Sequence, residues 1–412
     1  MKYFIVFFLC LVPVMSARAQ TAIGFGSVQV VSSNKEYGNL PVMDLDGGDY
    51  LHVSFDDLQD RDMTLRYRVR MLDVDGSPSQ MREIEYVSGI NKVDITETDY
   101  SFNTRSNYVH YSFSYPEKGR GVKLSGYYQF EIFDPNDPED VLLHVPFMVC
   151  EAAVNIGIEV KVPRRVEWRR SRQELAVTVD ASKSPVRIVQ ADRCLKVFAQ
   201  QNMNTQTIRP LPMLYQTGGR YEYRDRDEMV FDGLNEFRNM DIRPISYSGR
   251  GVEHVRLSSD RWNAQTLPQK SREYKPYVND DDIDGNFVIK AENMENSDLE
   301  AEYVNVHFVL QVEEDPMRKY YVIGKFNDWL CNEESQMTYR PGERAYTLSL
   351  PLKQGFYDYM FACQAGGGIS IPAVEGNNQE TENDYYVYVF YREPGGRYDR
   401  LLGVAKTNSR EK

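Results

Sequence analysis

Histidine and cysteine, which often serve as catalytic or metal-binding residues, are scarce in this chain of 412 amino acids. It has five histidines and five cysteines, and no Cys-x-x-Cys pair that would indicate a zinc site. The histidines are His52, His110, His144, His254 and His307. Each stands alone in a strand-like run, without a second ligand at metal-binding spacing. No Gly-x-Ser-x-Gly elbow, His-Glu-x-x-His pair or phosphate-binding loop is present. We therefore expect a protein that is not an enzyme, with no catalytic and no cofactor-binding residue.

Long apolar runs are also absent beyond the N-terminus. There, Lys2 precedes an apolar stretch from 4 to 15, and Ala17-Arg18-Ala19 follows with the small residues of a cleavage site. The apolar stretch is too short to span a membrane, and Pro13 interrupts it. We expect residues 1–19 to be a cleaved signal peptide. The mature protein is then soluble and exported, with no membrane-spanning segment of its own.

Positive charge is in the minority. The formal net charge is −13, and removal of Lys2 and Arg18 with the signal peptide gives −13 − 2 = −15. Such an acidic surface argues against nucleic acid and anionic lipid as partners. Four cysteines remain after cleavage, in a compartment that permits disulfides. Cys331 and Cys363 fall in one predicted domain, where they either pair or stay as buried free thiols.

Strand signals, by contrast, are abundant. Apolar and polar residues alternate, with many aromatic and β-branched residues, which is the pattern of half-buried strands. The clearest runs are Tyr50–Phe55, Leu65–Met71, Tyr108–Phe113 and Tyr127–Phe133. The 29 tyrosines suit strands with one wet face. Turn clusters separate the runs at the spacing of sandwich domains, and the sequence has no long amphipathic helix.

The sequence therefore predicts an all-β fold of three consecutive β-sandwich domains of the immunoglobulin-like type. The first is predicted to cover residues 21–152, the second 153–295 and the third 299–405. Residues 292–298 are charged and rich in Asn. They are the predicted linker between the second and third domains, because few contacts cross such polar stretches.

One stretch near the middle of the chain places opposite charges among aromatic and aliphatic residues. In an extended segment, Glu236 and Arg238 share one face and Phe237 points the other way. Asp241 and Arg243 form a second pair of opposite charges. Unpaired charges are costly in a half-buried segment, so we expect these charges to pair. The central residues of this motif are Asn235, Glu236, Phe237, Arg238 and Asp241.

This motif resembles the Asn-Glu-Phe-Arg-x-x-Asp core of the plug proteins of the type IX secretion system. This family was formerly classified as a domain of unknown function. Further pieces of that family's pattern occur in order along nearly the whole mature chain. They are Phe55–Leu58, Ser101–Thr104 and Leu124–Tyr128 before the motif, and Asp284–Asn286, Gly324–Trp329, Leu352–Tyr357, Glu375–Gly376, Thr381–Tyr385 and Tyr398–Arg400 after it. Each piece is short, and their ordered co-occurrence carries the resemblance.

The resemblance implies a function without catalysis. Plug proteins of this family are periplasmic subunits that reversibly seal the periplasmic opening of the giant outer-membrane β-barrel translocon. For this chain it predicts a periplasmic protein, attached peripherally to the outer membrane through that translocon as its partner. The five motif residues are then either contacts with the barrel or determinants of the fold. Paired charges around a buried aromatic residue favour the second alternative.

An acidic loop is the candidate metal site. Asp280, Asp282 and Asp284, followed by Gly285, match the start of a calcium-binding loop. Alternate carboxylates before a sharp turn can converge on a hard cation. The twelfth position, however, is Ala291 instead of a bidentate Glu, and the flanks are strand-like. The loop is therefore either a calcium site or a hairpin turn. Calcium is the single cofactor kept as a candidate.

The third predicted domain is similar to glycogen-binding β-sandwich modules through Tyr321–Trp329 and Gly355–Phe361. In those modules an exposed Trp stacks on sugar rings. This makes Trp329 a candidate glycan-stacking residue, and periplasmic carbohydrate binding the alternative function. In the other interpretation, the turn after the strand tucks Phe326 and Trp329 onto the edge of the sandwich, and the fold alone is shared.

Overall fold

The structure, a computed structural model, describes residues 24–61 and 63–411, so the predicted signal peptide lies outside the described residues. Strands dominate, and the all-β fold expected from the sequence is confirmed. The short helices lie in connections: α1 (Glu83–Tyr86), α2 (Ala191–Cys194), α3 (Ser297–Glu300), α4 (Pro372–Glu375), and the 3₁₀ turns η1 (Val166–Trp168), η2 (Thr205–Thr207), η3 (Asp227–Met229) and η4 (Lys325–Asn327). None of the helices in the described ranges has the length and apolar character needed to cross a membrane.

The N-terminal strands form two sheets that pack face to face, here named the first sheet pair. Its strands are β1 (Phe25–Ser32), β2 (Val42–Asp44), β3 (Leu51–Asp57), β4 (Arg66–Leu72), β5 (Val87–Ser88), β6 (Val93–Asp94), β7 (Glu97–Tyr100), β8 (Val109–Tyr115), β9 (Gly121–Val122), β10 (Gly126–Phe133) and β11 (Val141–Cys150). One sheet has the order β1-β3-β8-β7 and the other β2-β11-β10-β4-β6, beside a β5–β9 ribbon. Alternate residues such as Val69 and Phe113 point inward, and the rings of Phe130 and Phe147 stack with centroids 4.2 Å apart. Burial of these side chains between the sheets stabilises the pair.

The second sheet pair combines strands from the middle and the C-terminal end of the chain. They are β12 (Asn155–Lys161), β13 (Arg172–Asp180), β14 (Leu195–Gln201), β15 (Arg209–Pro210), β16 (Tyr215–Thr217), β17 (Arg220–Tyr223), β18 (Val230–Asp232), β30 (Asp384–Tyr391) and β31 (Arg400–Asn408). One sheet has the order β12-β13-β17-β16, with β18 on β13, and the other β15-β14-β30-β31. Their shared core contains Val177, Val197 and Val387.

The third sheet pair contains the remaining strands. They are β19 (Arg238–Asp241), β20 (Val252–Ser258), β21 (Arg261–Thr266), β22 (Gln269–Lys270), β23 (Phe287–Ile289), β24 (Tyr303–Gln311), β25 (Lys319–Ile323), β26 (Thr338–Arg340), β27 (Ala345–Lys353), β28 (Gly355–Ala365) and β29 (Gly368–Ser370). One sheet is centred on β28, which pairs with β19, β23, β25 and β29, and the other has the order β20-β21-β24-β27-β26. Met240, Val306 and Phe361 lie in their common core.

The strand pairing contradicts the predicted boundaries between the second and third domains. The C-terminal strand β30 pairs with β14 of the second sheet pair, not with the third. Strands β19 and β21, predicted to be in the second domain, pair with β28 and β24 of the third. The predicted linker, residues 292–298, lies between β23 and β24 of one sheet pair. Periodicity identifies a strand but carries no information about its partner, which is why the boundaries are wrong.

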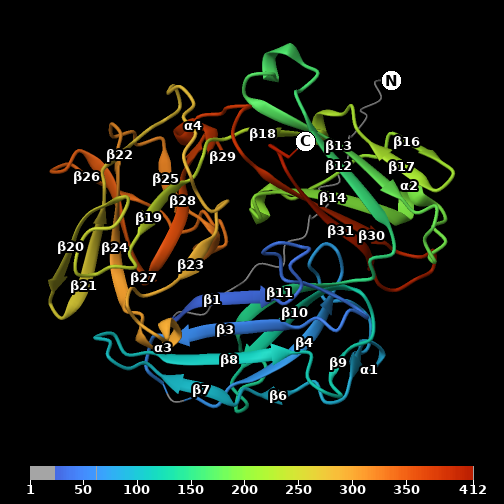
Figure 1. Cartoon of the computed structure of the whole chain (residues 1–412), viewed down its shortest axis with the longest axis horizontal. Coiled ribbons are helices and arrows are strands. Elements are labelled where there is room, and N and C mark those ends of the chain that lie inside the picture. Colours follow the sequence, from blue (N-terminus) through green and yellow to red (C-terminus); the bar gives the residue numbers. More distant parts are fainter. Residues whose placement is uncertain (1–23, 62, 412) are drawn as a thin grey trace, which may run out of the picture.

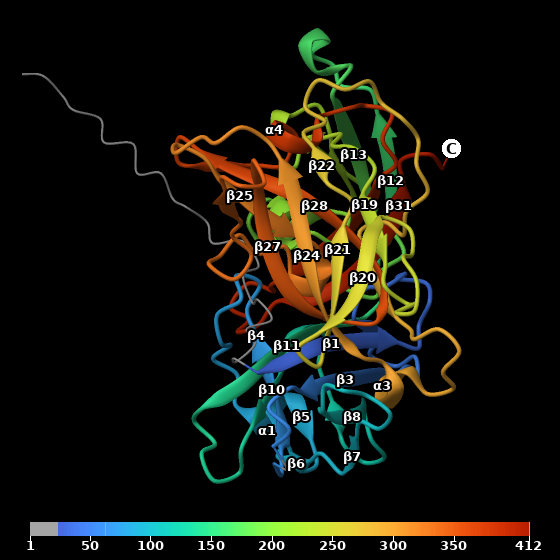
Figure 2. The same cartoon turned by 90° about the vertical axis from the view of Figure 1, so that its left-hand side faces the viewer.

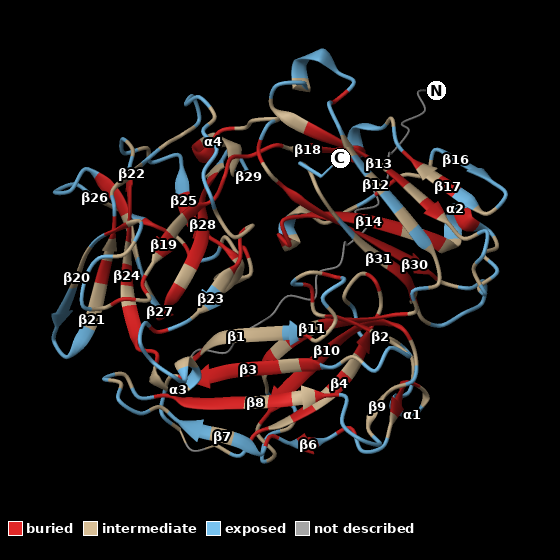
Figure 3. Cartoon of the chain, viewed as in Figure 1, coloured by how far each residue is buried: buried red, intermediate tan, exposed pale blue. Residues whose placement is uncertain are grey.

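The three sheet pairs lie around a common centre (Figure 1), and central strands of their sheets, such as β10, β28 and β30, are largely buried (Figure 3). Tyr127 and Met148 of the first pair form a hydrophobic cluster with Phe198 and Tyr388 of the second. Between the first and third pairs, the Tyr108 hydroxyl donates to a backbone carbonyl in the connection from α3 to β24, 3.0 Å away. The first pair is therefore in direct contact with both of the others.

Candidate functional site

The family motif lies where the chain passes from the second sheet pair to the third. Residues 235–238 are buried, and the part of the motif before β19 is irregular instead of extended. Gly233, just before it, has no room for a side chain, because a Cβ there would lie 2.0 Å from the carbonyl oxygen of Asn378. The start of the segment therefore lies between the backbone of Ser171, just before β13, and the connection that leads to β30.

Arg238 is held by a buried cluster of ion pairs. Its Nε donates to Glu375 at 2.9 Å, and its Nη2 donates to the carbonyl of Lys270 at 2.8 Å. Arg272 donates to the other carboxylate oxygen of Glu375 at 2.8 Å, and the N–H of Phe361 also donates to this carboxylate. Burial opposes the charge on Glu375, but the two arginines outweigh it and lower the pKa of the carboxyl. The cluster fastens β19 to α4 and β28.

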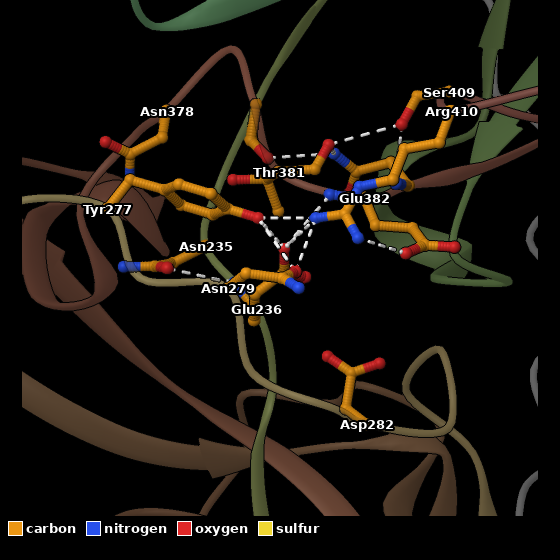
Figure 4. A network of polar contacts seen from close by, with 12 residues as sticks. Asn235, Glu236, Tyr277, Asn279, Asp282, Asn378, Thr381, Glu382, Ser409 and Arg410 are labelled. Atoms are coloured by element: carbon orange, nitrogen blue, oxygen red, sulfur yellow. Dashed lines mark hydrogen bonds and ion pairs between the residues drawn. The ribbon is translucent and has the colours of Figure 1, made fainter.

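Glu236 faces the C-terminal segment of the chain (Figure 4). Its Oε1 accepts hydrogen bonds from Arg410 at 2.9 Å, from the N–H of Glu382 at 3.3 Å and from the Tyr277 hydroxyl. Arg410 also donates to Asn279 at 2.6 Å. Burial raises the pKa of Glu236, although the hydrogen bond from Tyr277 and the charge of Arg410 favour its ionised form. The network ties the C-terminus to the motif.

The expected charge pairing within the motif is correct for only one of the two pairs. Asp241 and Arg243 do pair, with Nη2 donating to Oδ2 at 2.6 Å. Glu236 and Arg238 pair instead with residues 174 and 137 positions further along the chain. The reason is the irregular backbone before β19, since a period of two applies only to extended segments.

Phe237 joins two other predicted sites to the motif. Its ring packs on Trp329 with the centroids 5.8 Å apart, and its N–H donates to Asp282 at 2.8 Å. Gly285 lies against both rings, because a Cβ there would be 2.7 Å from Phe237 Cζ and 3.0 Å from Trp329 Cη2. The motif, the tryptophan and the acidic loop therefore form one packed site.

Trp329 is 2% exposed and lies in a cluster with Phe237 and Met360. A ring covered to this extent cannot stack on a sugar, so the prediction of an exposed, glycan-stacking Trp329 is wrong. The positive φ angles of Asp328 (51°) and Trp329 (61°) make a tight turn that folds the ring inward. The tucked position expected in the alternative interpretation is the one observed.

The acidic loop is held by backbone N–H groups. Asp358, on β28, accepts from the N–H groups of Ile283 and Gly285 at 2.7 and 3.0 Å, and Asp282 accepts from the N–H of Asp284 at 3.0 Å. Burial, followed by repulsion from Asp282, raises the pKa of Asp358 to about 8. Burial also raises the pKa values of Asp282 and Asp284 to about 6. Asp358 is thus mainly protonated at neutral pH.

The three candidate calcium ligands do not converge. Asp280 pairs with Arg250 at 2.5 Å, while both oxygens of Asp282 accept backbone N–H groups. Residues 24–61 and 63–411 contain no group of three or more His, Cys, Asp and Glu side chains able to hold a metal ion. The carboxylates of the loop accept backbone hydrogen bonds that form the turn, or form an ion pair at the surface. Calcium binding stays a prediction, which a melting curve with added calcium would test.

All four cysteines of the described ranges are free thiols, namely Cys150, Cys194, Cys331 and Cys363. Of the two alternatives for Cys331 and Cys363, the structure therefore has the unpaired one. Burial raises the pKa of the Cys331 thiol to about 11, and it also raises that of Cys363. Both are mainly protonated at neutral pH, and a thiol is a far weaker nucleophile than a thiolate.

Several partners of the motif were not predicted from the sequence. Tyr277, Arg272 and Arg410 lie far from it along the chain, and no local pattern points to them. Glu375 is different, because it belongs to a short piece of the family pattern. Its place in that pattern was the one signal that could have assigned it to the site.

Residues 26–151 match the family model of the type 9 secretion system plug protein 1st domain. This range spans the strands of the first sheet pair. Through this region the chain is similar to the type 9 secretion plug family. The resemblance found in the sequence is thereby confirmed for the family, and a role in type IX secretion is supported. The plug family is a non-enzymatic component of this system, at the periplasmic side of the outer membrane.

The likeness to a solved structure extends over all three sheet pairs. A hypothetical protein from Parabacteroides merdae ATCC 43184, with a crystal structure at 2.30 Å, has a TM-score of 0.90 and 26% identity, over 95% of this chain and 99% of that chain. Two other structures have TM-scores too low to indicate a common fold. One is manganese lipoxygenase of Gaeumannomyces graminis with a partial zonadhesin of Komagataella pastoris (9% identity, 94% of this chain, 97% of that chain, TM-score 0.16). The other is Escherichia coli alpha-2-macroglobulin activated by porcine elastase (9% identity, 93% of this chain, 30% of that chain, TM-score 0.17). The sequence matches no curated protein.

Proposed function

We propose that this protein is a periplasmic plug subunit that reversibly seals the periplasmic opening of the outer-membrane β-barrel translocon of type IX secretion. The match of residues 26–151 to the plug first domain carries this proposal. The mechanism is steric and needs no catalytic residue. The subunit docks on the barrel while the channel is idle and leaves when cargo enters.

The joints between the sheet pairs support such a role, because a stopper must resist deformation. Buried side chains such as Tyr127 and Tyr388 pack the first pair on the second, and the Glu236–Arg410 network ties the third pair to the C-terminal segment. A compact chain of this length has a radius of gyration of about 21 Å. The body is therefore tens of ångströms across, the scale of a channel that passes folded cargo.

Reversible docking favours a contact of moderate area with a polar rim over a large apolar one. The acidic surface charge predicted from the sequence suits this arrangement, since it keeps the undocked subunit soluble. Specificity then comes from the barrel surface, and no small ligand is required.

Two measurements test the proposal. A strain that lacks this protein should admit a large hydrophilic antibiotic such as vancomycin, and the wild-type gene should restore exclusion. Affinity capture of the tagged full-length protein from gently solubilised outer membranes should recover one very large barrel protein in near-equal amount. An unchanged permeability barrier, together with capture of the protein alone, would contradict the plug role.

A further inference from the structure

Strand β1 is a sheet edge without the usual protection against pairing. In its sheet, β3 lies on one side, and no strand of the described residues lies on the other. Free N–H and C=O groups at an edge attract further strands, so natural edges normally carry charged residues or proline. The sequence of β1 is Phe-Gly-Ser-Val-Gln-Val-Val-Ser, which contains neither. Its protection must come from its surroundings or from a partner.

The other long edge strands of the described chain differ from β1 in this respect. Strands β12, β20 and β31 also have at least seven residues and end their sheets. Each carries charged residues of both signs, or several of one sign: Glu159 and Lys161 in β12, Glu253 and Arg256 in β20, and Arg400 and Lys406 in β31. Among these long edge strands, β1 therefore differs from the others in having no charged residue.

Only the second half of β1 offers a regular edge. The register with β3 shifts between Gly26 and Gln29, which marks a bulge. At that end the Ser27 hydroxyl lies 2.6 Å from the Tyr303 hydroxyl of the third sheet pair, so the edge is closed there. From Gln29 to Ser32 the pairing with β3 is continuous. Ser32 is buried and its carbonyl already accepts from Lys35 Nζ at 3.1 Å, so the open part of the edge is residues 29–31.

This edge faces a cleft between the sheet pairs with a volume of about 1940 Å³, which is lined by all of β1, by part of β11 and by the end of β27. Figure 1 shows β1 on the side of the first sheet pair that faces the other two, and Figure 2 shows it directly below β24 and β27. Small-molecule sites usually enclose about 300–1,000 Å³. The cleft is larger, and a peptide strand that rises about 3.3 Å per residue suits its extent along β1 better.

We propose that β1 binds an extended peptide segment of the secretion partner, which adds to the sheet as a further strand beside residues 29–31. This inference rests on the proposed function and names its docking surface. Backbone hydrogen bonds would supply the affinity, as in other cases of strand addition. The segment must lack proline where it pairs with β1, because proline has no N–H to donate to the sheet.

The cleft also indicates the charge of the segment. Glu333 and Glu334 are exposed on its wall, and Asp282 and Asp284 lie deeper. Three lysines line the cleft: Lys35 donates to the carbonyl of Ser32, Lys353 is engaged by a buried carboxylate and Lys325 by the Asn286 side chain. A segment that is uncharged beside β1 and basic near the two exposed glutamates is complementary to this lining. A second copy of the chain fits less well, since its own β1 is recessed in the same kind of cleft.

Val31 is the position at which to test the edge. Val28 and Val30 pack on the core of the first sheet pair, whereas Val31 lines the cleft and is 47% exposed. Val31→Lys introduces the charge that protects other edges without disturbing the core. The matched control is Leu257→Lys, on the edge strand β20 outside the cleft, where the side chain is 43% exposed.

The measurement is capture of the barrel from solubilised outer membranes by each full-length variant. We expect Val31→Lys to keep the wild-type melting temperature and to recover about tenfold less barrel, the effect of losing one of the minority of interface residues that contribute measurably to binding. Leu257→Lys should recover it like the wild type. Undiminished recovery by Val31→Lys would overturn the inference and leave the plug role standing. If the wild type recovers no barrel, both proposals fail.

A second measurement covers the case in which Val31→Lys lowers the melting temperature. A photo-crosslinking amino acid at Val31, in the otherwise unchanged chain and in the producing bacterium, should form an adduct with one contiguous segment of a secretion-system protein. Leu257 serves again as the control position. A cross-link to β1 of a second copy, a cross-link to residues 20–23 of the same chain, or no adduct at all would each overturn the inference.

Discussion

Lys353 of β27 places its Nζ 2.7 Å from Oδ2 of Asp56 on β3, although the two residues are 297 positions apart and belong to different sheet pairs. Both side chains are buried. The Tyr303 hydroxyl donates to the same oxygen at 2.6 Å, His110 Nδ1 lies 2.6 Å from the other, and Lys353 also donates to the carbonyl of Asp298. Burial lowers the pKa of Lys353, and Asp56 opposes this effect. The pair is the central polar link between the first and third sheet pairs.

We expect Lys353→Met to lower the free energy of unfolding by about 3–5 kcal/mol, because it leaves the Asp56 carboxylate buried without its cation. Urea unfolding monitored by tyrosine fluorescence measures the change. The control is Lys319→Met, at the exposed start of β25, which should stay within about 0.5 kcal/mol of the wild type. Equal stability of the two variants would show that the link contributes nothing.

Gly285→Ala tests the contact between the acidic loop and the motif. The new Cβ would meet Phe237 at 2.7 Å, and the φ of +77° adds strain. Gly48 has a similar φ of +73° with nothing within 4 Å of its Cβ position. Gly48→Ala should therefore cost about 1–2 kcal/mol from the backbone alone. Gly285→Ala should cost about 1–3 kcal/mol more, from overpacking. Thermal or urea unfolding of both variants gives the difference, and a difference of zero would refute the packed site.

The strands could be predicted from the sequence because their signal is local. In β4 and β8, alternate residues such as Val69 and Phe113 are buried as the pattern indicated. The partners of the strands could not be predicted in this way. Strand β30 pairs with β14 from Leu195↔Tyr391 to Gln201↔Tyr385, across nearly half of the chain. Periodicity is the same whichever sheet a strand joins, so the second and third predicted domains had wrong boundaries.

For the site, too, the sequence indicated the local pieces but not how they meet in the fold. Four short pieces of the family pattern meet at the motif: Asp284–Asn286, Gly324–Trp329, Glu375–Gly376 and Thr381–Tyr385. Their order along the chain identified the family, but their convergence was visible only in the fold. The burial of Trp329 depends on a turn with two positive φ angles, which its residue types did not indicate.

Arg410→Ala is expected to release the C-terminal segment. Glu236, buried beside it, would lose its cation and keep the hydrogen bond from Tyr277. Loss of a hydrogen bond to a charged group costs about 1.5–3 kcal/mol. Trimming by a carboxypeptidase should become faster, because the end then depends on the hydrogen bonds of Asn408 and Ser409 with residues 381–384. Arg193→Ala, on the exposed face of α2, is the control. Unchanged trimming would mean that Arg410 does not hold the C-terminus.

Asp358 makes the stability of the fold depend on pH. Its pKa is about 8 in the folded chain, mainly because of burial, and about 3.9 in an unfolded one. The folded state therefore binds more protons between these values, and the contribution of Asp358 to stability falls as the pH rises from about 4 to 8. Asp358→Asn keeps an oxygen for the N–H groups of Ile283 and Gly285 but cannot titrate. Urea unfolding at pH 5, 6 and 7 should show the wild type losing stability relative to this variant, by up to about 1.4 kcal/mol per pH unit. Parallel stability curves for the wild type and Asp358→Asn would show that another group causes the pH dependence. The control is Asp192→Asn, on the exposed face of α2, which should have the same curve as the wild type.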